Sequence, residues 1–199
     1  MRAGASPSRV ALVSLCLLAM AGCGGRSAPT HFYLLAPQGK VPSPAAGDGN
    51  AMTIGVGPAR LPPYLDRPQI VTRKSQDEIG LSEFELWGEP LTDGVARAIA
   101  EDLRALLPSA RVALFPWVGP RVVQYQVLVD VVRFDGSPGG PVALEASWRI
   151  LGEDRKDVRE GRFTHSEPTR EPGYVALVGA MSRSLGALSR EIAAALPGR

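Results

Sequence analysis

The sequence has few of the residues from which metal and redox sites are built. Its 199 residues include only 2 cysteines and 2 histidines, and the cysteines are not spaced as C-x-x-C. A closed zinc site takes four cysteine or histidine ligands, so this chain would need carboxylates to complete one. His31 and His165 lie in separate apolar segments, without an H-x-x-x-H or H-E-x-x-H partner. We therefore expect neither a metal site nor a cofactor.

The sequence also lacks an excess of charge of either sign. It has 22 basic and 20 acidic side chains. Arg2 and Arg9 lie in a leader that we expect to be removed, which leaves 20 of each sign. A non-specific nucleic-acid binder needs a cluster of cations to displace phosphate counterions. The neutral balance therefore argues against nucleic acid as a partner.

Motifs that carry catalysis are missing as well. There is no G-x-S-x-G nucleophile elbow, no phosphate-binding loop and no dinucleotide fingerprint. Gly55 and Gly57 precede Pro58 rather than a helix, so the context that would give them a phosphate-binding role is absent. We expect a protein that is not an enzyme, and hold a hydrolase acting on envelope material only as a remote alternative.

The apolar run near the N-terminus is too short to cross a membrane as a helix. Residues 10–21 carry no charge, and at 1.5 Å per residue they span about 18 Å, against about 30 Å of hydrocarbon. Arg2 and Arg9 precede the run, which is the pattern of a secretory signal peptide. We expect residues 1–22 to be that signal peptide.

The run ends in Met20-Ala21-Gly22-Cys23, which resembles the lipobox of bacterial lipoproteins, with methionine in place of the usual leucine. The resemblance implies that Cys23 is acylated and becomes the first mature residue, and two acyl chains give stable membrane anchoring. Gly24 follows where aspartate would cause inner-membrane retention, which points to the outer membrane, facing the periplasm. The alternative is a simple secretory peptide, cleaved near Ala21, that leaves Cys23 free.

Apolar periodicity predicts one domain over residues 31–199, joined to Cys23 by a tether that ends at residue 30 and reaches at most about 25 Å. Strands are predicted at residues 31–35, 52–57, 69–73, 111–115, 122–134, 142–151 and 158–165. Pro58 ends the second of these strands. Residues 79–86 are a candidate partner for the strand at 69–73. Helices are predicted from Pro90 to residue 106 and over 172–196, and residues 135–141 form a turn.

The order β-β-β-α-β-β-β-β-α predicts an α/β (α+β) fold. We expect a single mixed, mostly antiparallel sheet with two helices packed on one face, and 122–134 as its central strand.

A proline-rich loop leading into a strand, residues 61–73, is the candidate interaction site. Its prolines fix an extended path. Asp66 and Arg67 either tie the loop down or, with Tyr64, offer a stiff contact surface to a partner at low entropic cost. Trp87 either fills the junction between sheet and helix or faces the same partner.

At this loop the sequence resembles PqiC-like ABC-type transport auxiliary lipoproteins, which are found alongside MCE-domain proteins. The resemblance rests on Tyr64-Leu-Asp-Arg-Pro-Gln-Ile-Val-Thr-Arg73, Trp87-Gly-Glu-Pro-Leu91 and Phe115-Pro-Trp117, and on the helix from Tyr174 to Ile192. It implies a non-enzymatic outer-membrane subunit of a lipid transport system that docks the periplasmic MCE tunnel and supports membrane integrity. Because MCE assemblies are rings, it also implies a homo-oligomeric ring. The alternative function is a free-standing periplasmic lipid-binding carrier.

Overall fold

The computed structural model of the protein describes residues 28–39, 51–117 and 123–197. The predicted signal peptide and Cys23 lie outside these residues, as does most of the tether. Within the described ranges, no helix is both long enough and apolar enough to cross a membrane.

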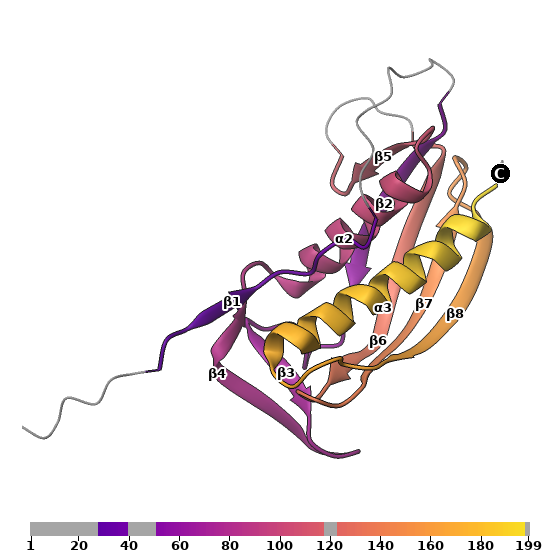
Figure 1. Cartoon of the computed structure of the whole chain (residues 1–199). Helices are drawn as coiled ribbons and strands as arrows, with labels where there is room; N and C mark the ends of the chain where they lie inside the picture. The colour runs from indigo at the N-terminus through magenta and orange to yellow at the C-terminus, as the bar shows by residue number, and fades with distance from the viewer. Residues whose placement is uncertain (1–27, 40–50, 118–122, 198–199) are drawn as a thin grey trace, which may run out of the picture.

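Eight strands form one sheet, and two helices that contact each other cover one of its faces (Figure 1). The elements, in chain order, are β1 (His31–Tyr33), β2 (Thr53–Arg60), β3 (Gln69–Arg73), β4 (Ile79–Trp87), α2 (Leu91–Leu106), β5 (Arg111–Leu114), β6 (Tyr125–Gly136), β7 (Val142–Leu151), β8 (Asp157–Glu167) and α3 (Tyr174–Ala195). The α/β class, the single sheet and the two helices on one face are therefore confirmed.

Strand β6 is the centre of the sheet, as predicted. One edge pairs with β7 over nearly its whole length, from Gln126 to Gly136. The other edge is shared by two strands. β2 pairs with the first half of β6, and β3 meets its end through the pair Thr72 and Gly136. The sheet therefore branches at β6, with β2 and β5 on one arm and β3, β4 and β1 on the other.

The prediction of a mostly antiparallel sheet was wrong. Four of the seven strand pairings between described residues are parallel, namely β1–β4, β2–β5, β2–β6 and β3–β6. Parallel neighbours need a crossover connection. After β2, the chain makes the antiparallel hairpin β3–β4 and runs through α2 before β5 and β6 return beside β2. Four strands, not three, therefore precede the first helix.

Strand β2 continues through Pro58 to Arg60, whereas the sequence placed its end at Pro58. Its register against β6 shifts between Val56 and Ala59. Proline has no backbone N–H to donate, and an irregularity in the ladder is where a strand tolerates it. The sequence showed the proline but not the shift that accommodates it.

The core lies between the sheet and the two helices. The predicted helical stripes are largely buried: in α2, Val95, Ile99 and Leu103 are fully buried, and in α3 the same holds for Leu177, Leu185, Leu188 and Ile192. The facing side of the sheet contributes Ile54, Val127, Leu144 and Ile150, all fully buried. This burial confirms the prediction that the two helices pack on one face of the sheet.

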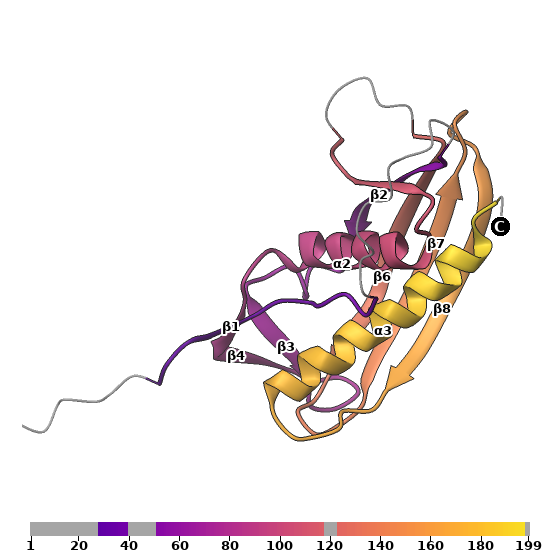
Figure 2. The ribbon, with the colours of Figure 1, turned by 45° about the horizontal axis from the view of Figure 1, so that its top comes forward.

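Residues 34–39, which we call the strap, run from β1 across α2 and α3 (Figure 2). The Arg97 guanidinium donates to the Leu35 carbonyl at 2.9 Å, and the Ala36 N–H donates to Ser182 Oγ at 3.1 Å. Asp102 accepts from the backbone N–H groups of Gln38, at 2.6 Å, and Gly39, at 3.2 Å. The strap is thereby fixed to both helices.

A glycine in β8 makes room for an indole on the neighbouring strand. Trp148 of β7 pairs with Gly161, and its Nε1 donates to Glu191 of α3 at 2.8 Å. A Cβ on Gly161 would lie 2.6 Å from Trp148 Cε2. The indole could avoid that contact only by leaving Glu191.

We expect Gly161→Ala to lower the free energy of unfolding by about 1–3 kcal/mol, because it overpacks this contact. Gly179→Ala is the control, since a Cβ there meets only Arg183 Nη1, at 3.5 Å, and alanine favours a helix by up to about 1 kcal/mol. Urea unfolding of both variants measures the difference. Equal changes of the same sign would contradict this account of Gly161.

Candidate interaction site

The loop between β2 and β3 is held by its own backbone. The Leu65 N–H donates to the Pro62 carbonyl, and the Arg67 N–H to the Leu65 carbonyl, both at 2.9 Å. The Leu65 side chain is buried and anchors the loop to the core. Two prolines with fixed φ precede these turns, so the loop has a single well-defined path.

A buried carboxylate joins this loop to the sheet. Asp135, which lies in β6 and is fully buried, accepts from the Tyr64 hydroxyl at 2.9 Å. Arg73 of β3 binds the same carboxylate with two nitrogens, Nε at 3.2 Å and Nη2 at 2.6 Å. Arg133 adds a third cationic contact through Nε at 3.0 Å. We call Tyr64, Arg73, Arg133 and Asp135 the Asp135 cluster.

The electrostatics of this cluster favour an ionised Asp135. Burial acts to raise the pKa of this carboxyl, but hydrogen bonds from Arg73, Arg133 and Tyr64 outweigh burial and hold the pKa below its usual range. The pKa of Tyr64 rises to about 12, first because its hydroxyl is buried and then because Asp135 lies beside it. Tyr64 is therefore a neutral donor at physiological pH, and the cluster is a fixed structural unit.

The predicted contact residues lie in different environments. Tyr64 is half-buried and points to Asp135, while Asp66 is exposed and Arg67 is partly exposed. The Arg67 Nε is buried and has no hydrogen-bond partner in the described part of the chain. Asp66 is the most exposed of the three, whereas Tyr64 and Arg67 are both intermediate in burial.

Trp87 lies beside the end of the same loop, in the core. Its backbone N–H donates to the Pro68 carbonyl at 2.7 Å, and the residue is 7% exposed. It pairs with Tyr33 across β1 and β4. The structure thus places Trp87 where the packing interpretation expected it, at the junction of sheet and helix.

The roles of two acidic residues that organise the fold were not predicted from the sequence. Asp135 was assigned to the turn at 135–141, but it belongs to β6. Its spacing of two from Arg133 was the available signal, because that spacing puts both on one face of a strand. Asp102 lies three residues after Ile99 on the buried stripe of α2, where a carboxylate needs partners. Burial raises the pKa of Asp102 despite the N–H donors of the strap.

The two histidines each lie beside a glutamate, on different parts of the sheet. His31 Nδ1 lies 3.1 Å from Glu85 Oε1, and His165 Nε2 lies 3.1 Å from Glu167 Oε2. Glu167 is also bound by Arg183 of α3 at 2.6 Å. Among the described residues, no group of three or more histidines, cysteines or carboxylates could hold a metal ion.

Comparison with known families assigns the chain to one of them. The family of ABC-type transport auxiliary lipoprotein components matches residues 33–193, which span β1 to α3. The chain belongs to this family. It is therefore an auxiliary lipoprotein component of an ABC-type transport system, and such components are generally non-catalytic. A lipoprotein family implies a lipid anchor in a membrane. The expected relationship to PqiC-like proteins is confirmed.

Two solved structures share the fold. One, of an uncharacterized protein, has a TM-score of 0.67 at 17% identity and covers 84% of this chain and 98% of its own. A Xanthomonas campestris protein of the family DUF330 has a TM-score of 0.60 at 22% identity and covers 81% of this chain and 92% of its own. A PelC dodecamer from Paraburkholderia phytofirmans has a TM-score of 0.42 at 12% identity, covering 71% and 92%. No curated protein matches.

We expect Asp135→Asn to lower the free energy of unfolding at pH 7 by about 3–5 kcal/mol, because it leaves Arg73 and Arg133 without their shared carboxylate. The control is Asp130→Asn, also in β6, whose ion pair with Arg60 is exposed and contributes about 0–1 kcal/mol. Denaturant unfolding measures both. Similar effects of the two substitutions would show that the Asp135 cluster does not stabilise the fold.

The stability difference between the wild type and Asp135→Asn should depend on pH. The folded-state pKa of Asp135 is lowered, so its contribution to stability is present above its unfolded pKa, about 3.9, and is lost as pH falls through the lower folded value. The wild type should therefore lose its advantage over Asp135→Asn in acid, and keep it towards neutral pH.

Proposed function

We propose that this auxiliary lipoprotein is anchored in the outer membrane through acylated Cys23, faces the periplasm, and docks the far end of an MCE-protein tunnel in a lipid transport system. In that role it supports membrane integrity. Residues 1–22 serve as the signal peptide, residues 23–30 as anchor and tether, and residues 31–199 as the docking domain. Gly24, rather than aspartate, supports release to the outer membrane.

The observation that carries the docking role is the way the loop at 61–68 is held. Tyr64 fixes the loop to Asp135, Leu65 buries its tip in the core, and the Pro68 carbonyl binds the backbone of β4. Asp66 and Arg67 lie between these fixed points and carry opposite charges. A partner that binds a surface already held in one conformation loses little entropy in ordering it. This supports Asp66 and Arg67 as partner contacts.

We expect Arg67→Glu to lower recovery of an MCE protein about tenfold when the native lipoprotein is crosslinked in whole envelopes and its attached proteins are identified by mass spectrometry. A loss of one interfacial contact worth about 1.4 kcal/mol gives that factor. Asp66→Arg should act in the same direction. Because Asp66 is exposed, this second variant separates a lost contact from a fold disturbed at the partly buried Arg67.

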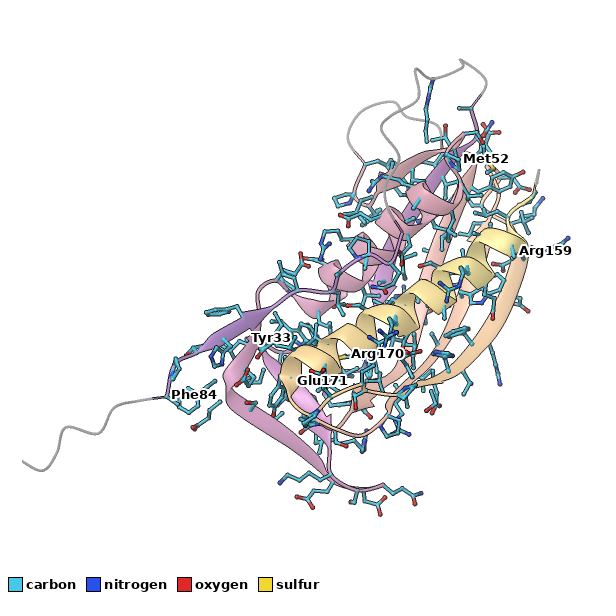
Figure 3. The ribbon with its side chains drawn as sticks, viewed as in Figure 1. Tyr33, Met52, Phe84, Arg159, Arg170 and Glu171 are labelled. Atoms are coloured by element: carbon cyan, nitrogen blue, oxygen red, sulfur yellow. The ribbon has the colours of Figure 1, made fainter. Side chains whose placement is uncertain are left out.

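The control for charge reversal is Arg159→Glu, an exposed arginine of β8 (Figure 3). It should leave recovery unchanged. If an MCE protein is recovered equally with all three variants, the proposed docking function stands, but the loop has a purely structural role. If no MCE protein is recovered even with the wild type, the docking proposal fails.

Cys23→Ser, expressed behind a cleavable secretory signal peptide in place of residues 1–22, should move the protein from the membrane fraction to the soluble periplasm, because the anchor is lost. Native mass spectrometry of this soluble form should show a homo-oligomer, as expected for a cap on a ringed tunnel, and monomer alone across micromolar concentrations would contradict the ring. Phospholipid extracted from the same form would favour the alternative function, a free-standing lipid-binding carrier.

A further inference from the structure

Exposed apolar side chains gather at one end of the molecule. Of the eight large apolar side chains that are exposed among the described residues, five belong to β1, β4, the residue after β1, and the start of α3. They are Phe32, Leu34, Leu81, Phe84 and Val175. This end lies away from the C-terminus, and Figure 3 places Phe84 beside the start of β1.

The register of β1 against β4 sorts these side chains by face. Tyr33 pairs with Trp87, and the Tyr33 ring lies 6.4 Å from that of Tyr174, so this face is the one covered by α3. Side chains alternate along a strand. Phe32 and its partner Leu86 therefore lie on the opposite face. Phe84 lies two residues before Leu86, and Figure 3 shows it beside the start of β1.

Leu34 extends the same surface. A Cβ on Gly88 would lie 3.2 Å from Leu34 Cδ2, and Gly88 is two residues beyond Leu86. We call Phe32, Leu34, Phe84 and Leu86 the outer patch. Phe32 is 68% exposed and Leu34 56% exposed, which makes the patch a larger apolar surface than isolated exposed residues would be.

The position of the patch in the chain indicates what covers it. His31 begins β1 and lies eight residues after Cys23, so at about 3.6 Å per extended residue the strand cannot lie farther than about 29 Å from the acylated cysteine. The first element that the anchored chain enters is therefore the one that carries Phe32 and precedes Leu34. Apolar side chains held this close to a bilayer can insert at the boundary of headgroups and acyl chains.

We propose that the outer patch is a lipid-contact surface that seats the β1–β4 end of the domain on the membrane. This rests on the proposed acylation of Cys23. The charged neighbours are Glu83, Glu85 and His31, of which the two acids give no attraction to anionic lipid. The surface therefore binds phospholipid without net charge, such as zwitterionic phosphatidylcholine, through apolar contact, with little dependence on salt.

The test uses the acylated protein in phosphatidylcholine vesicles that contain a nitroxide-labelled lipid. Phe84→Cys and Val158→Cys are each labelled with a fluorophore at the new thiol, since acylation occupies the Cys23 sulfur. Phe84 and Val158 are both 36% exposed, and Val158 lies on β8, away from the patch. We expect quenching at position 84 to exceed quenching at position 158 by about threefold or more, because only the former enters the lipid boundary.

Intact mass separates the two proposals. If the mass shows acyl chains and the two labels are quenched equally, the outer patch is not a lipid-contact surface, while the anchor stands. If the mass shows no acyl chains, the anchor fails. The outer patch is then decided by the flotation measurement below, because a free Cys23 thiol would also take the fluorophore. A label at 84 that is shielded without quenching, increasingly with protein concentration, would assign the patch to a second copy and overturn the lipid contact.

A second measurement does not depend on a label. The mature chain, residues 23–199 without the signal peptide and carrying Cys23→Ser, is mixed with phosphatidylcholine vesicles, and the bound fraction is measured by flotation. Adding Phe32→Ser and Phe84→Ser should reduce binding about tenfold. Adding Val132→Ser and Val158→Ser, at positions 62% and 36% exposed, should not. An equal effect of the two pairs, or none, would contradict the proposal.

Discussion

The sheet branches at β6, and the way each arm is joined to this strand determines how the domain is held together. β7 holds one edge of β6 by ten register pairs, but β3 is joined to the other edge by a single pair, Thr72 with Gly136. The arm formed by β3, β4 and β1 would therefore be weakly attached by backbone pairing alone. The Asp135 cluster lies at this point, because Arg73 follows Thr72 and Asp135 precedes Gly136. Its side-chain hydrogen bonds between Arg73 and Asp135 add the attachment between β3 and β6 that the single backbone pair does not provide.

A buried carboxylate is costly unless its oxygens are satisfied, and Asp135 meets that condition from three elements at once. Arg73 comes from β3, Arg133 from β6 itself, and Tyr64 from the loop. Besides stabilising the fold, a cluster of this kind favours one register of β3 against β6, since slipping either strand would leave a charge buried without its partner. The loop at 61–68 then takes its position from the branch, not from its own prolines alone.

How far the sequence could predict this structure depends on the range of each interaction. The stripes of α2 and α3 and the limits of β7 follow from local periodicity, and the structure has them close to where they were expected. The parallel pairings do not, because they depend on which distant strands meet after a crossover. Asp135 was lost for the same reason. Beside Gly136 and Pro138 it looks like a turn residue, and only its contact with Arg73, 62 residues away, shows why it is buried.

The candidate site, too, could be predicted from the sequence only in part. The motif at 64–73 could be picked out from the sequence, but the separate tasks of its residues could not. Tyr64 and Arg73 turn inward to Asp135, whereas Asp66 and Arg67 remain at the surface. Trp87 is distinctive in the sequence, but it is buried against the β1 arm. A resemblance between sequences therefore records both the residues that hold a surface in place and those that present it.

Residues 31–39, which follow the proposed tether, are fixed to the core. Beyond β1, the strap buries Leu35 and is bonded to Arg97 and Asp102 of α2 and to Ser182 of α3. β1 itself pairs with β4, which belongs to the arm that the Asp135 cluster joins to β6. A force or position imposed at Cys23 would reach the domain through two fixed attachments, one to the helices and one to the β4 arm. If Cys23 is the anchor, as proposed, the length of the tether before His31 sets how far the domain can stand from the bilayer.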